Sequence, residues 1–571
     1  MKYVLGTAPV TADGSVFFDA PVNRPISIQP LDAEGRAVQL MRSWTVGMPG
    51  EYVSCIGCHE NPSVTARPLQ IVRRKPSPVT PPNGLAKPRT WSFLREVQPI
   101  LQRRCVGCHN KDVDPSVAAR QPDERGILRF TAFEHTPFTR GDMPNFADIR
   151  PVRIQYWSPT YVNGPVLMDG KCASGVGAFS KSYFNLVAWV RRPGPESDNR
   201  LMNPMEYHAN TSPLVQILKA GHKGVQLTDE EWRTIYTWID LNVPFWGTWT
   251  DQVTWWQNDG NRRWAGDGTN HVENLARLEC SRKLRQYAER RFQGFWNPED
   301  DPELDTYGYE QATRDLAKIK FEPPKGKRKV KAPPPKSVRV ESEPRQALAL
   351  PGGELAFRRV ADGLWFAETE LPLANYLAFK PDHYNGFIDW LGKDHNCPGE
   401  SVMSPEQPVI RVSFDEAKAY ATWLSEKTGH RFRLPTEAEW EQAARAGAGG
   451  DYAWGTDVAA FTNVANLADV QVEALPNQFY FFNPRLRHPT ADDGEMTVAV
   501  ARTARYAPNA YGLFNMIGNV EEWCEGPNGE AVARGGAFDT LPRRAKFKRR
   551  IPYFPWQRVY NTGVRLVMEE K

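Results

Sequence analysis

The stretch Arg433–Arg445, RLPTEAEWEQAAR, indicates how the C-terminal part of this chain folds. A Pro-Thr pair before an acidic, alanine-rich run predicts the start of a helix, with Thr436 as its N-cap and Trp440 as its apolar anchor. Two glycine-containing stretches follow, GNVEEW at 518–523 and RGGAF at 534–538. Because glycine permits backbone geometries closed to other residues, both stretches predict turns and strand ends. We therefore expect an α+β unit here.

Longer stretches of this region read QPVIRVSFDEAKAYATWLSEKTGHRFRLPTEAEWEQAARAG, YAWG, NAYGLFNMIGNVEEW, ARGGAF and NTGVRLV. Together they resemble the formylglycine-generating enzyme (sulfatase-modifying factor) family. The resemblance implies a C-type-lectin-like fold over residues 351–571. It also implies two calcium sites, whose oxygen ligands suit a hard cation: Asn515, Gly518, Val520 and Glu522 in one, and Asn466, Leu467, Asp493 and Glu495 in the other. The alternative is that these polar groups only hydrogen-bond their own loops.

The oxidase activity of that family rests on a pair of cysteines that bind copper. In this sequence the corresponding stretch is RGGAFDTLPRRA, and the two cysteine positions fall on Thr540 and Ala545. Cys524 is alone in the region and does not replace a pair. Because a fold without its site does not carry the site's function, we expect a non-catalytic recognition domain with a protein or glycan ligand. A formylglycine-generating-type modifying enzyme is the alternative.

Two Cys-x-x-Cys-His motifs lie in the first part of the chain, one at Cys55, Cys58 and His59 and the other at Cys105, Cys108 and His109. With 8 Cys and 10 His in 571 residues, composition alone predicts roughly 0.002 such matches. In this pattern both thiols add to the vinyl groups of one porphyrin and the histidine binds the iron. The sequence therefore predicts two c-type haems.

A single zinc site is the alternative, since the four motif cysteines would supply four ligands. Zinc ribbons usually separate their two cysteine pairs by about 15–20 residues and need no histidine after each pair. The spacing here therefore favours haem. The other cysteines are Cys172, Cys280, Cys397 and Cys524, which in an oxidising compartment pair in one of three ways or remain buried thiols.

The chain is long enough for about three or four domains. Short β-rich runs broken by turn signals predict a small antiparallel β module with the first haem at 1–85. A helical cytochrome c-like domain with the second haem is expected at 86–248. A Trp-rich, charged helical segment and a Pro/Lys linker follow at 249–350, before the C-terminal domain.

Two helices are expected to frame the second haem. In the first, at 91–104, Leu94, Val97 and Leu101 share one face and Pro99 is a kink. The second begins with the capping box of Thr228 and Glu231 and ends at Asn242 and Pro244. Its apolar face comprises Trp232, Ile235, Tyr236 and Ile239.

The sixth iron ligand decides between electron transfer and catalysis. For the second haem the candidates are His222, which we favour because it directly precedes the closing helix, then His208, and Met202 or Met205. A haem with two histidine ligands carries electrons. For the first haem His135 and an open site are both considered. Each histidine has an ordinary hydrogen-bonded role as its alternative.

The region 3–247 resembles the middle and C-terminal haem regions of the hydrazine synthase alpha subunit and its cytochrome relatives. The resemblance is carried by LGTAPVTADGSVFF, by PISIQPLDAEGRAVQLMRSWTVGMPGEYVSCIGCHE, by CVGCH, and by the GH and WIDLN block. It implies a diheme module whose second haem has His109 and His222 as ligands. In that family a tyrosine after the first motif ligates the catalytic haem. Here the stretch is ENPSVTARP, which favours the wider cytochrome group over hydrazine synthesis.

The composition of the chain limits the classes of molecule that it is expected to bind. A net charge of +4 indicates neither nucleic acid nor an acidic membrane surface, and no apolar run reaches the length of a membrane span. No export signal is visible, yet haem c is attached outside the cytoplasm. We therefore expect a fragment, mature form or truncated gene model of a periplasmic or otherwise extracytoplasmic protein.

Together these features predict an exported diheme cytochrome that transfers electrons to redox partner proteins or complex subunits. The alternative is a haem-dependent redox enzyme with an open first haem.

Overall fold

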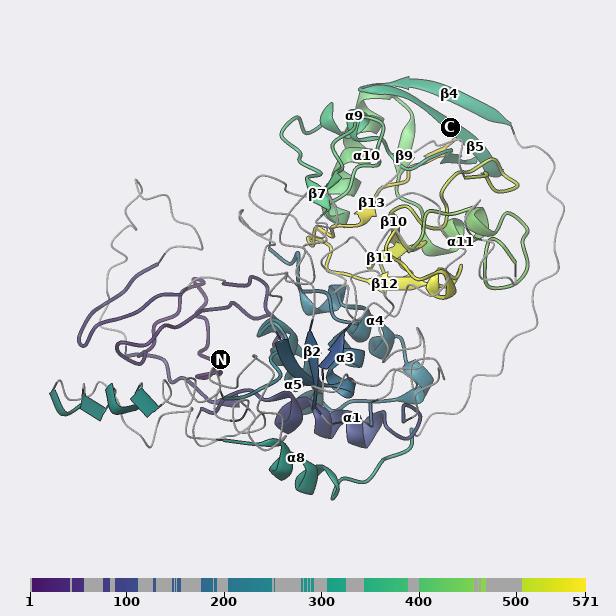
Figure 1. Cartoon of the computed structure of the whole chain (residues 1–571). Helices are drawn as coiled ribbons and strands as arrows, with labels where there is room; N and C mark the ends of the chain where they lie inside the picture. Colours follow the sequence, from purple (N-terminus) through teal and green to yellow (C-terminus); the bar gives the residue numbers. More distant parts are fainter. Residues whose placement is uncertain are drawn as a thin grey trace, which may run out of the picture.

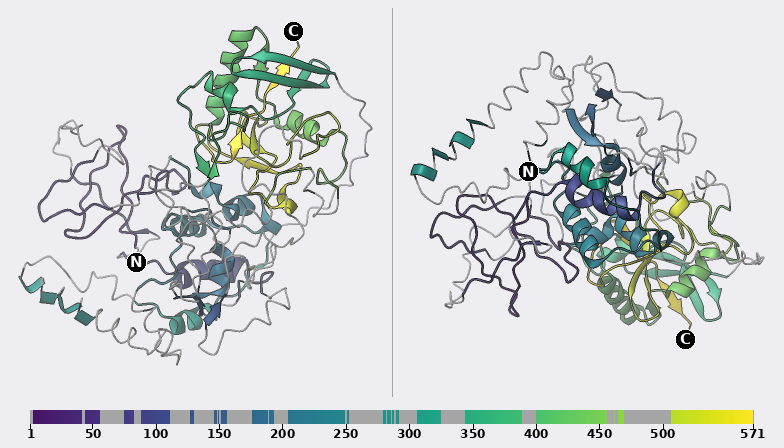
Figure 2. Two further views of the ribbon diagram at one scale, coloured as in Figure 1. Left: turned by 45° about the horizontal axis from the view of Figure 1, so that its top comes forward. Right: turned by 90° about the horizontal axis from the view of Figure 1, so that it is seen from below.

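The computed structural model describes residues 3–41, 44–55, 75–82, 88–110, 127–129, 146–147, 149, 151–155, 176–187, 189–192, 204–248, 251, parts of 279–291, 306–324, 344–388, 400–455, 461, 464–468 and 506–570. A C-terminal domain, green to yellow in Figure 1, lies above a helical part in blue and teal. The N-terminal segment, in purple, lies beside the helical part in the views of Figure 2.

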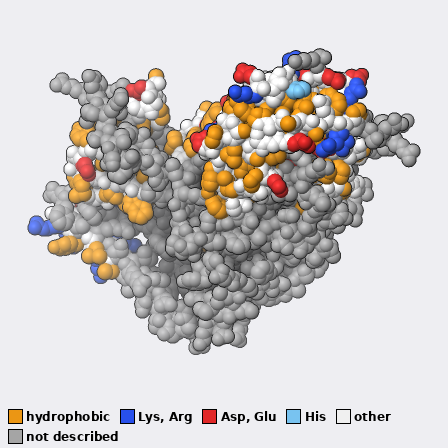
Figure 3. All heavy atoms as spheres, turned by 90° about the horizontal axis from the view of Figure 1, so that it is seen from above, with side chains coloured by type: hydrophobic (Ala, Val, Ile, Leu, Met, Phe, Trp, Pro, Cys, Tyr) orange, Lys and Arg blue, Asp and Glu red, His pale blue; other side chains and the backbone are white. Residues whose placement is uncertain are grey.

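The N-terminal segment pairs differently from the expected β module. Its described residues form isolated antiparallel bridges, Tyr3 with Thr90, Thr7 with Thr80, Ile26 with Thr45, and Leu31 with Ala37, rather than continuous strands. Turn residues recur too closely for long ladders to form. Hydrophobic side chains are consequently exposed on this segment, at the left of Figure 3. They include Trp44, Val46, Met48, Tyr52 and Val53.

The helical part contains η2 (Phe93–Val97), α1 (Gln98–Arg104), α3 (Lys181–Val187), η3 (Ala209–Thr211), α4 (Pro213–Lys219), η4 (His222–Gly224), α5 (Asp229–Asp240) and α8 (Tyr309–Leu316). Pro99 lies in the first turn of α1, directly after the π-helical turn η2, so the expected kink is a change of helix type. Leu94, Val97 and Leu101 are buried as predicted.

Helix α5 begins at the predicted capping box. The Glu231 backbone N–H donates to the Thr228 hydroxyl, and the Thr228 N–H donates to the Glu231 carboxylate. Ile235, Tyr236 and Ile239 are buried, and so is Trp238, which the expected apolar face did not include. The core around α5 is therefore wider than one helical stripe and is built largely from aromatic side chains.

A sheet crosses the stretch that the sequence left unassigned. Its strands are β1 (Ile127–Arg129), β2 (Pro151–Gln155) and β3 (Val176–Ser180), in that order, with β1 parallel and β3 antiparallel to β2. The part expected to be helical thus combines helices with a sheet, and a cytochrome c-like fold for 86–248 stays a prediction.

The C-terminal domain contains two main sheets. The larger has the order β4 (Arg345–Leu350), β5 (Gly353–Ala361), β6 (Leu364–Ala367), β14 (Val567–Glu569), β9 (Arg431–Arg433), and its neighbours are antiparallel. The other has the order β12 (Arg550–Pro552), β11 (Ala531–Arg534), β10 (Glu521–Glu525), β13 (Thr562–Gly563). A hairpin pairs β7 (Phe387–Ile388) with β8 (Glu400–Ser401). Strand β4 lies before residue 351, so the sheet begins inside the stretch that the sequence assigned to the linker.

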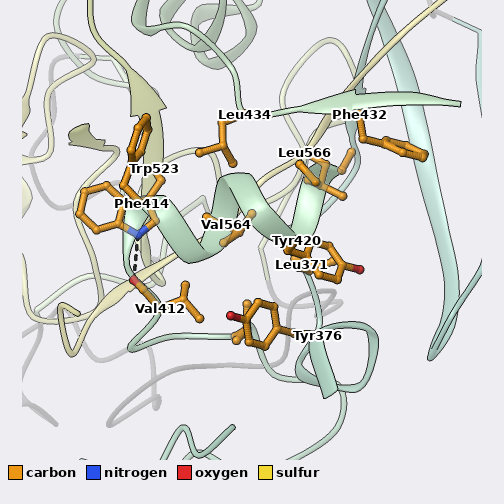
Figure 4. Packing of buried hydrophobic residues seen from close by; sticks show 14 of the residues in the cluster. Leu371, Tyr376, Val412, Phe414, Tyr420, Phe432, Leu434, Trp523, Val564 and Leu566 are labelled. Carbon is orange, nitrogen blue, oxygen red and sulfur yellow. Dashed lines mark hydrogen bonds between the residues drawn. The ribbon is translucent and has the colours of Figure 1, made fainter. Parts of the chain in front are cut away.

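The described residues of this domain also form three α-helices, α9 (Leu373–Leu377), α10 (Phe414–Thr428) and α11 (Glu437–Arg445). Helix α11 is the one predicted from RLPTEAEWEQAAR: the Thr436 hydroxyl accepts from the Glu439 N–H at 3.3 Å, and Trp440 is fully buried. Figure 4 shows the core beside α10, where the Trp523 indole N–H donates to the Val412 carbonyl at 3.0 Å.

No helix in the described ranges has both the length and the apolar character required to cross a bilayer.

Candidate functional site

The second Cys-x-x-Cys-His motif forms a helical turn at the end of α1. The Cys105 N–H donates to the Leu101 carbonyl at 2.8 Å, and the N–H groups of Cys108 and His109 both donate to the Cys105 carbonyl at 3.0 Å. The two thiols are therefore one turn apart and His109 follows at once. Gly107 lies against the Phe321 ring, and a Cβ at this position would overlap it. Packing therefore favours glycine at position 107, between the two cysteines of the motif.

His222 reaches the same place from a different part of the chain. It lies in η4, a tight turn after α4 in which Gly221 and Gly224 have φ of 85° and 79°. The rings of His109 and His222 have centroids 6.0 Å apart and planes inclined by 30°. The Phe146 ring also packs against His109, with ring centroids 5.2 Å apart.

The distance between the His109 and His222 rings is close to that expected for two imidazoles bound to one metal ion. With a metal–nitrogen bond of about 2 Å on each side, and a ring centroid about 1 Å behind each nitrogen, two imidazoles on opposite sides of one metal lie roughly 6 Å apart. Burial lowers the pKa of His222, and the neighbouring His109 and Arg544 lower it further. A neutral imidazole is the form that binds a metal. Cys105, Cys108, His109 and His222 are thus residues that would suit a c-type haem.

His208, the second candidate ligand, is fully engaged elsewhere. Its Nδ1 accepts from the Asn210 backbone N–H at 3.2 Å, and its Nε2 lies 2.9 Å from the Asp32 carboxylate. Its ring also packs edge-on against Phe554 of the C-terminal domain, at 5.9 Å. With both nitrogens occupied, His208 joins three segments of the chain.

The remaining ligand candidates are placed only in part. Met205 is 1% exposed and its N–H donates to the Val38 carbonyl at 2.8 Å. Cys55, the first residue of the first motif, is exposed. Cys58, His59, His135 and Met202 lie outside the described residues. Of the other cysteines, Cys280 and Cys524 are free thiols, and Cys172 and Cys397 lie outside the described ranges.

Glu231 links α1, the helix that precedes the second Cys-x-x-Cys-His motif, to α5. Its carboxylate caps α5 and also accepts from Arg103 at 2.7 Å and from Arg104 at 3.1 Å, at the end of α1. Burial would raise the pKa of Glu231, but bonds from Thr228 and the two arginines outweigh it and lower the pKa. One carboxylate thus fixes the angle between the two helices that frame His109 and His222.

In the C-terminal domain, Glu522 of the first expected calcium set has other partners. One carboxylate oxygen of Glu522 lies 2.7 Å from Arg565 Nη2, and the other accepts from the Trp440 indole at 2.6 Å. All three residues are buried. In this arrangement the guanidinium of Arg565 already pairs with the carboxylate that the expected calcium site would use.

A second buried carboxylate lies beside this pair. Glu370 accepts from the amides of Asn515 and Asn519 at 3.0 Å each, and it lies 4.0 Å from Arg565. Burial raises the pKa of Glu370, and Arg565 opposes the rise. Asn515, Gly518 and Asn519 have φ of 54°, 84° and 60°, so the loop is strongly curved. Calcium binding here stays a prediction. It would require the Glu522 carboxylate to give up its bond to Arg565 or Trp440 for the ion.

The second expected calcium set is described only in part. Asn466 and Leu467 are fully buried, and the Asn466 amide donates to the Asn519 side-chain oxygen at 3.1 Å. Asp493 and Glu495 lie outside the described residues. Among the residues that the structure describes, no three His, Cys, Asp or Glu side chains gather into a metal-binding group.

The stretch between the two missing cysteines faces the helical part. Thr540 and Ala545 are 6% and 0% exposed. Between them, Leu541 packs into the hydrophobic core of the helical part, and the Arg544 guanidinium lies 4.8 Å from the centre of the Trp189 ring. A cavity of about 40 Å³ lies at this junction. Sequence reasoning missed Leu541 and Arg544 because their partners are over 300 residues away.

Further contacts join the same two units. The side-chain amides of Asn210 and Gln557 bond to each other, and Arg411 donates to Glu206 at 2.9 Å. The Arg191 guanidinium lies between the rings of Tyr207 and Tyr560. The C-terminal domain thus binds the helical part through a buried polar and aromatic surface.

Two protein families match parts of the chain. Residues 343–570 match the sulfatase-modifying factor enzyme 1-like domain, and residues 1–60 match the hydrazine synthase alpha subunit middle domain. The formylglycine-generating enzyme of Thermomonospora curvata is 38% identical over 167 residues, which are 29% of this chain and 46% of that protein. An inactive C-alpha-formylglycine-generating enzyme 2 of Bos taurus is 31% identical over 164 residues, 27% of this chain and 46% of that protein. The chain thus spans less than half the length of these curated relatives.

Among solved structures, Treponema denticola variable protein 1 has 18% identity and a TM-score of 0.30, over 40% of this chain and 99% of that one. PvdO from Pseudomonas aeruginosa has 22% identity and a TM-score of 0.26, over 40% and 92%. By the two family matches, the chain carries a sulfatase-modifying factor enzyme 1-like domain at 343–570 and, at 1–60, a segment that matches the hydrazine synthase alpha subunit middle domain.

Proposed function

We propose that this chain is an exported diheme c-type cytochrome that transfers electrons, and that its C-terminal domain is a docking scaffold for the haem-bearing part. The observation that carries the proposal is the 6.0 Å separation of the His109 and His222 rings, next to a helical turn that presents Cys105 and Cys108. A haem bound there would supply a one-electron couple at its iron.

The residues around this pair have separate roles. Cys105 and Cys108 would attach a haem covalently, and His109 and His222 would supply ligands to its iron. Glu231 keeps α1 and α5 at a fixed angle, through its bonds to Arg103 and Arg104. With both His109 and His222 as iron ligands, the site would suit electron transfer rather than binding of a small substrate. Its partners would be redox proteins or subunits of a redox complex.

The first motif is the place where catalysis remains an alternative. A haem at Cys55, Cys58 and His59 with an open position would bind a small molecule. Carbon monoxide binding by the reduced protein distinguishes the two cases. Because haem c is attached outside the cytoplasm, the proposal places the mature protein there.

The docking role of the C-terminal domain is supported by its contacts. Thr540 and Ala545 replace the family's cysteines and are buried, and the loop between them packs on the helical part. The face of the C-terminal domain that carries residues 540–545 is thus covered by the helical part of the same chain. This reduces the surface left for an external protein or glycan ligand.

A second candidate function is modification of protein cysteines to formylglycine. It is favoured by the match to the sulfatase-modifying factor domain and to formylglycine-generating enzymes, among which the relatives include inactive forms. Incubation of the full chain with copper and a cysteine-containing peptide, followed by mass spectrometry, tests it. We expect unchanged peptide. Conversion would make this activity the main function.

The electron-transfer proposal is tested on protein exported from a host with haem-attachment machinery. Haem staining after denaturation should be positive, and the absorption spectrum should show a low-spin haem that is indifferent to carbon monoxide. His222→Ala should make that haem high-spin and able to bind carbon monoxide. His430→Ala, on a partly buried histidine of the C-terminal domain, is the matched control and should leave the spectrum unchanged. A protein without covalent haem would refute the proposal.

A further inference from the structure

Phe146 is bonded, at both of its backbone polar groups, to α1 and to the motif turn that follows α1. Its N–H donates to the His109 carbonyl at 2.8 Å, and its carbonyl accepts from the Gln98 side-chain amide at 2.9 Å. Gln98 is the first residue of α1. Phe146 and Gln98 are 6% and 0% exposed, so that water competes little for these two bonds. Phe146 is therefore fixed to the same rigid unit that carries the motif.

The Gln98 carboxamide is itself held in one orientation. Its Oε1 accepts from the hydroxyl of Ser182, a fully buried residue of α3, at 2.5 Å. Since the Phe146 carbonyl only accepts, the amide nitrogen of Gln98 must face Phe146 and the amide oxygen must face Ser182. A buried hydrogen-bonded path thus leads from α3 through Gln98 to Phe146.

The side chain of Phe146 carries this anchoring to the His109 ring. The centroids of these two rings are 5.2 Å apart, and their planes are inclined by 43°. The His109 ring also faces that of His222, at 6.0 Å. Because an imidazole turns about its bond to Cβ, a fixed aromatic ring at this distance limits the orientations that His109 can adopt.

We propose that Gln98 is a positioning residue for His109, and that it acts through Phe146 to hold the His109 imidazole in the orientation that faces His222. This inference rests on the proposed function, in which both histidines are iron ligands. The bonds of the Gln98 side chain go to Phe146 and Ser182, so its effect on His109 passes through Phe146. Residues that support a ligand from behind in this way commonly orient it and tune the metal.

The test compares three variants of the full chain, exported from a host with haem-attachment machinery. Gln98→Met nearly keeps the size of the side chain and removes both of its bonds. Phe146→Leu keeps the two backbone bonds and removes the ring. Asn375→Leu is the matched control, because Asn375 is a buried amide of the C-terminal domain that also donates to backbone carbonyls, those of Pro351 and Gly353, at 3.0 Å each.

The first measurement, amide hydrogen exchange at Phe146, requires no haem. We expect this amide to exchange about tenfold faster in Gln98→Met than in the unaltered chain, because the bond from Gln98 no longer opposes the local opening that frees it. Asn375→Leu should leave the exchange rate unchanged. Equal rates in Gln98→Met and Asn375→Leu would show that Gln98 does not anchor Phe146 and would overturn the inference.

The second measurement is the electron paramagnetic resonance spectrum of the oxidised chain, which depends on how the two imidazole ligands of a low-spin haem are oriented. We expect the signal to shift or broaden in both Gln98→Met and Phe146→Leu, and to stay unchanged in Asn375→Leu. A merely structural role of Gln98 would lower the melting temperature, as in the control, without altering this signal.

The outcomes separate the inference from the proposed function. Covalent haem with an unaltered signal in both Gln98→Met and Phe146→Leu would overturn the inference and leave the electron-transfer proposal intact. Absence of haem from the unaltered chain would refute the proposed function and the inference with it. If Gln98→Met fails to fold, Phe146→Leu decides: a signal identical to that of Asn375→Leu would overturn the inference.

Discussion

The side-chain amides of Asn210 and Gln557 donate to each other, at 2.9 and 3.0 Å, although 347 residues separate them in sequence. Asn210 belongs to the helical part and Gln557 to the C-terminal domain, and they are 9% and 0% exposed. Such a reciprocal pair satisfies both amides away from water. The two units therefore form a specific interface rather than a loose contact.

Removing one member of this pair should weaken the interface. Asn210→Ala leaves the buried Gln557 amide without its partner, and we expect a loss of about 1–3 kcal/mol in the free energy of unfolding. The double variant with Gln557→Ala should cost less than the sum of the two single changes. Urea unfolding of the full chain measures these values. Asn528→Ala, at an exposed turn, is the control and should stay within about 0.5 kcal/mol of the unaltered chain. Fully additive losses would show that the two amides are not coupled.

Arg565 should be among the most sensitive residues of the C-terminal domain. Its guanidinium is 0% exposed and faces both Glu522 and Glu370. Arg565→Met would leave the buried carboxylates without a cation, and we expect a loss of about 3–5 kcal/mol in the free energy of unfolding.

The control for this change is Arg550→Gln, which breaks an exposed pair with Glu437 and should cost about 0–1 kcal/mol. Denaturant unfolding monitored by tryptophan fluorescence compares the two variants. Added calcium should not restore Arg565→Met if the guanidinium is the only cation required there. A variant rescued by calcium would instead support the calcium loop that the sequence predicts.

Asp240 should make the stability of the helical part depend on pH. Burial raises the pKa of this carboxyl from 3.8 to about 7, although the Ala37 backbone N–H donates to it and opposes the rise. Because the folded state binds the proton more tightly than the unfolded chain, Asp240 contributes stability that is complete below about pH 4 and is lost as the pH rises through about 7. The contribution is on the order of a few kcal/mol.

Asp240→Asn keeps an oxygen that accepts from the Ala37 N–H but does not ionise. The difference in unfolding free energy between the variant and the unaltered chain should therefore change between pH 4 and pH 7, in favour of the variant at the higher pH. Thermal unfolding across this range measures it. A difference that is constant with pH would contradict the raised pKa.

His208 and His222 should respond differently to substitution. Because both ring nitrogens of His208 are engaged by Asn210 and Asp32, His208→Ala should leave the haem spectrum unchanged and lower the melting temperature. His222→Ala should change the spectrum, as described above. Absorption spectroscopy and thermal unfolding of the same samples separate the two effects. A high-spin haem in His208→Ala would transfer the ligand role to His208.

The local features of this fold could be predicted because short-range interactions produce them. The helices at α5 and α11 begin at capping boxes, in which residues three apart bond to each other, so the pattern is visible in sequence. The turn that carries Cys105 and His109 is equally local. The β1–β3 sheet escaped prediction because its strands are short and far apart in sequence, so that no local pattern links them. Strand β4 was assigned to the linker because its pairing with β5 leaves most of its side chains exposed.

The sequence by itself determined the two haem-type motifs, the family of the C-terminal domain, the helices with local caps, and the loss of the cysteine pair at Thr540 and Ala545. Only the tertiary structure decided which histidine faces His109 and what partners Glu522 and Arg544 have. The reason is physical: a ligand pair or a buried ion pair depends on distances between residues far apart in the chain, and these are set by packing of whole units. His208 and His222 look alike in sequence, but one is bonded to Asp32 and the other faces His109.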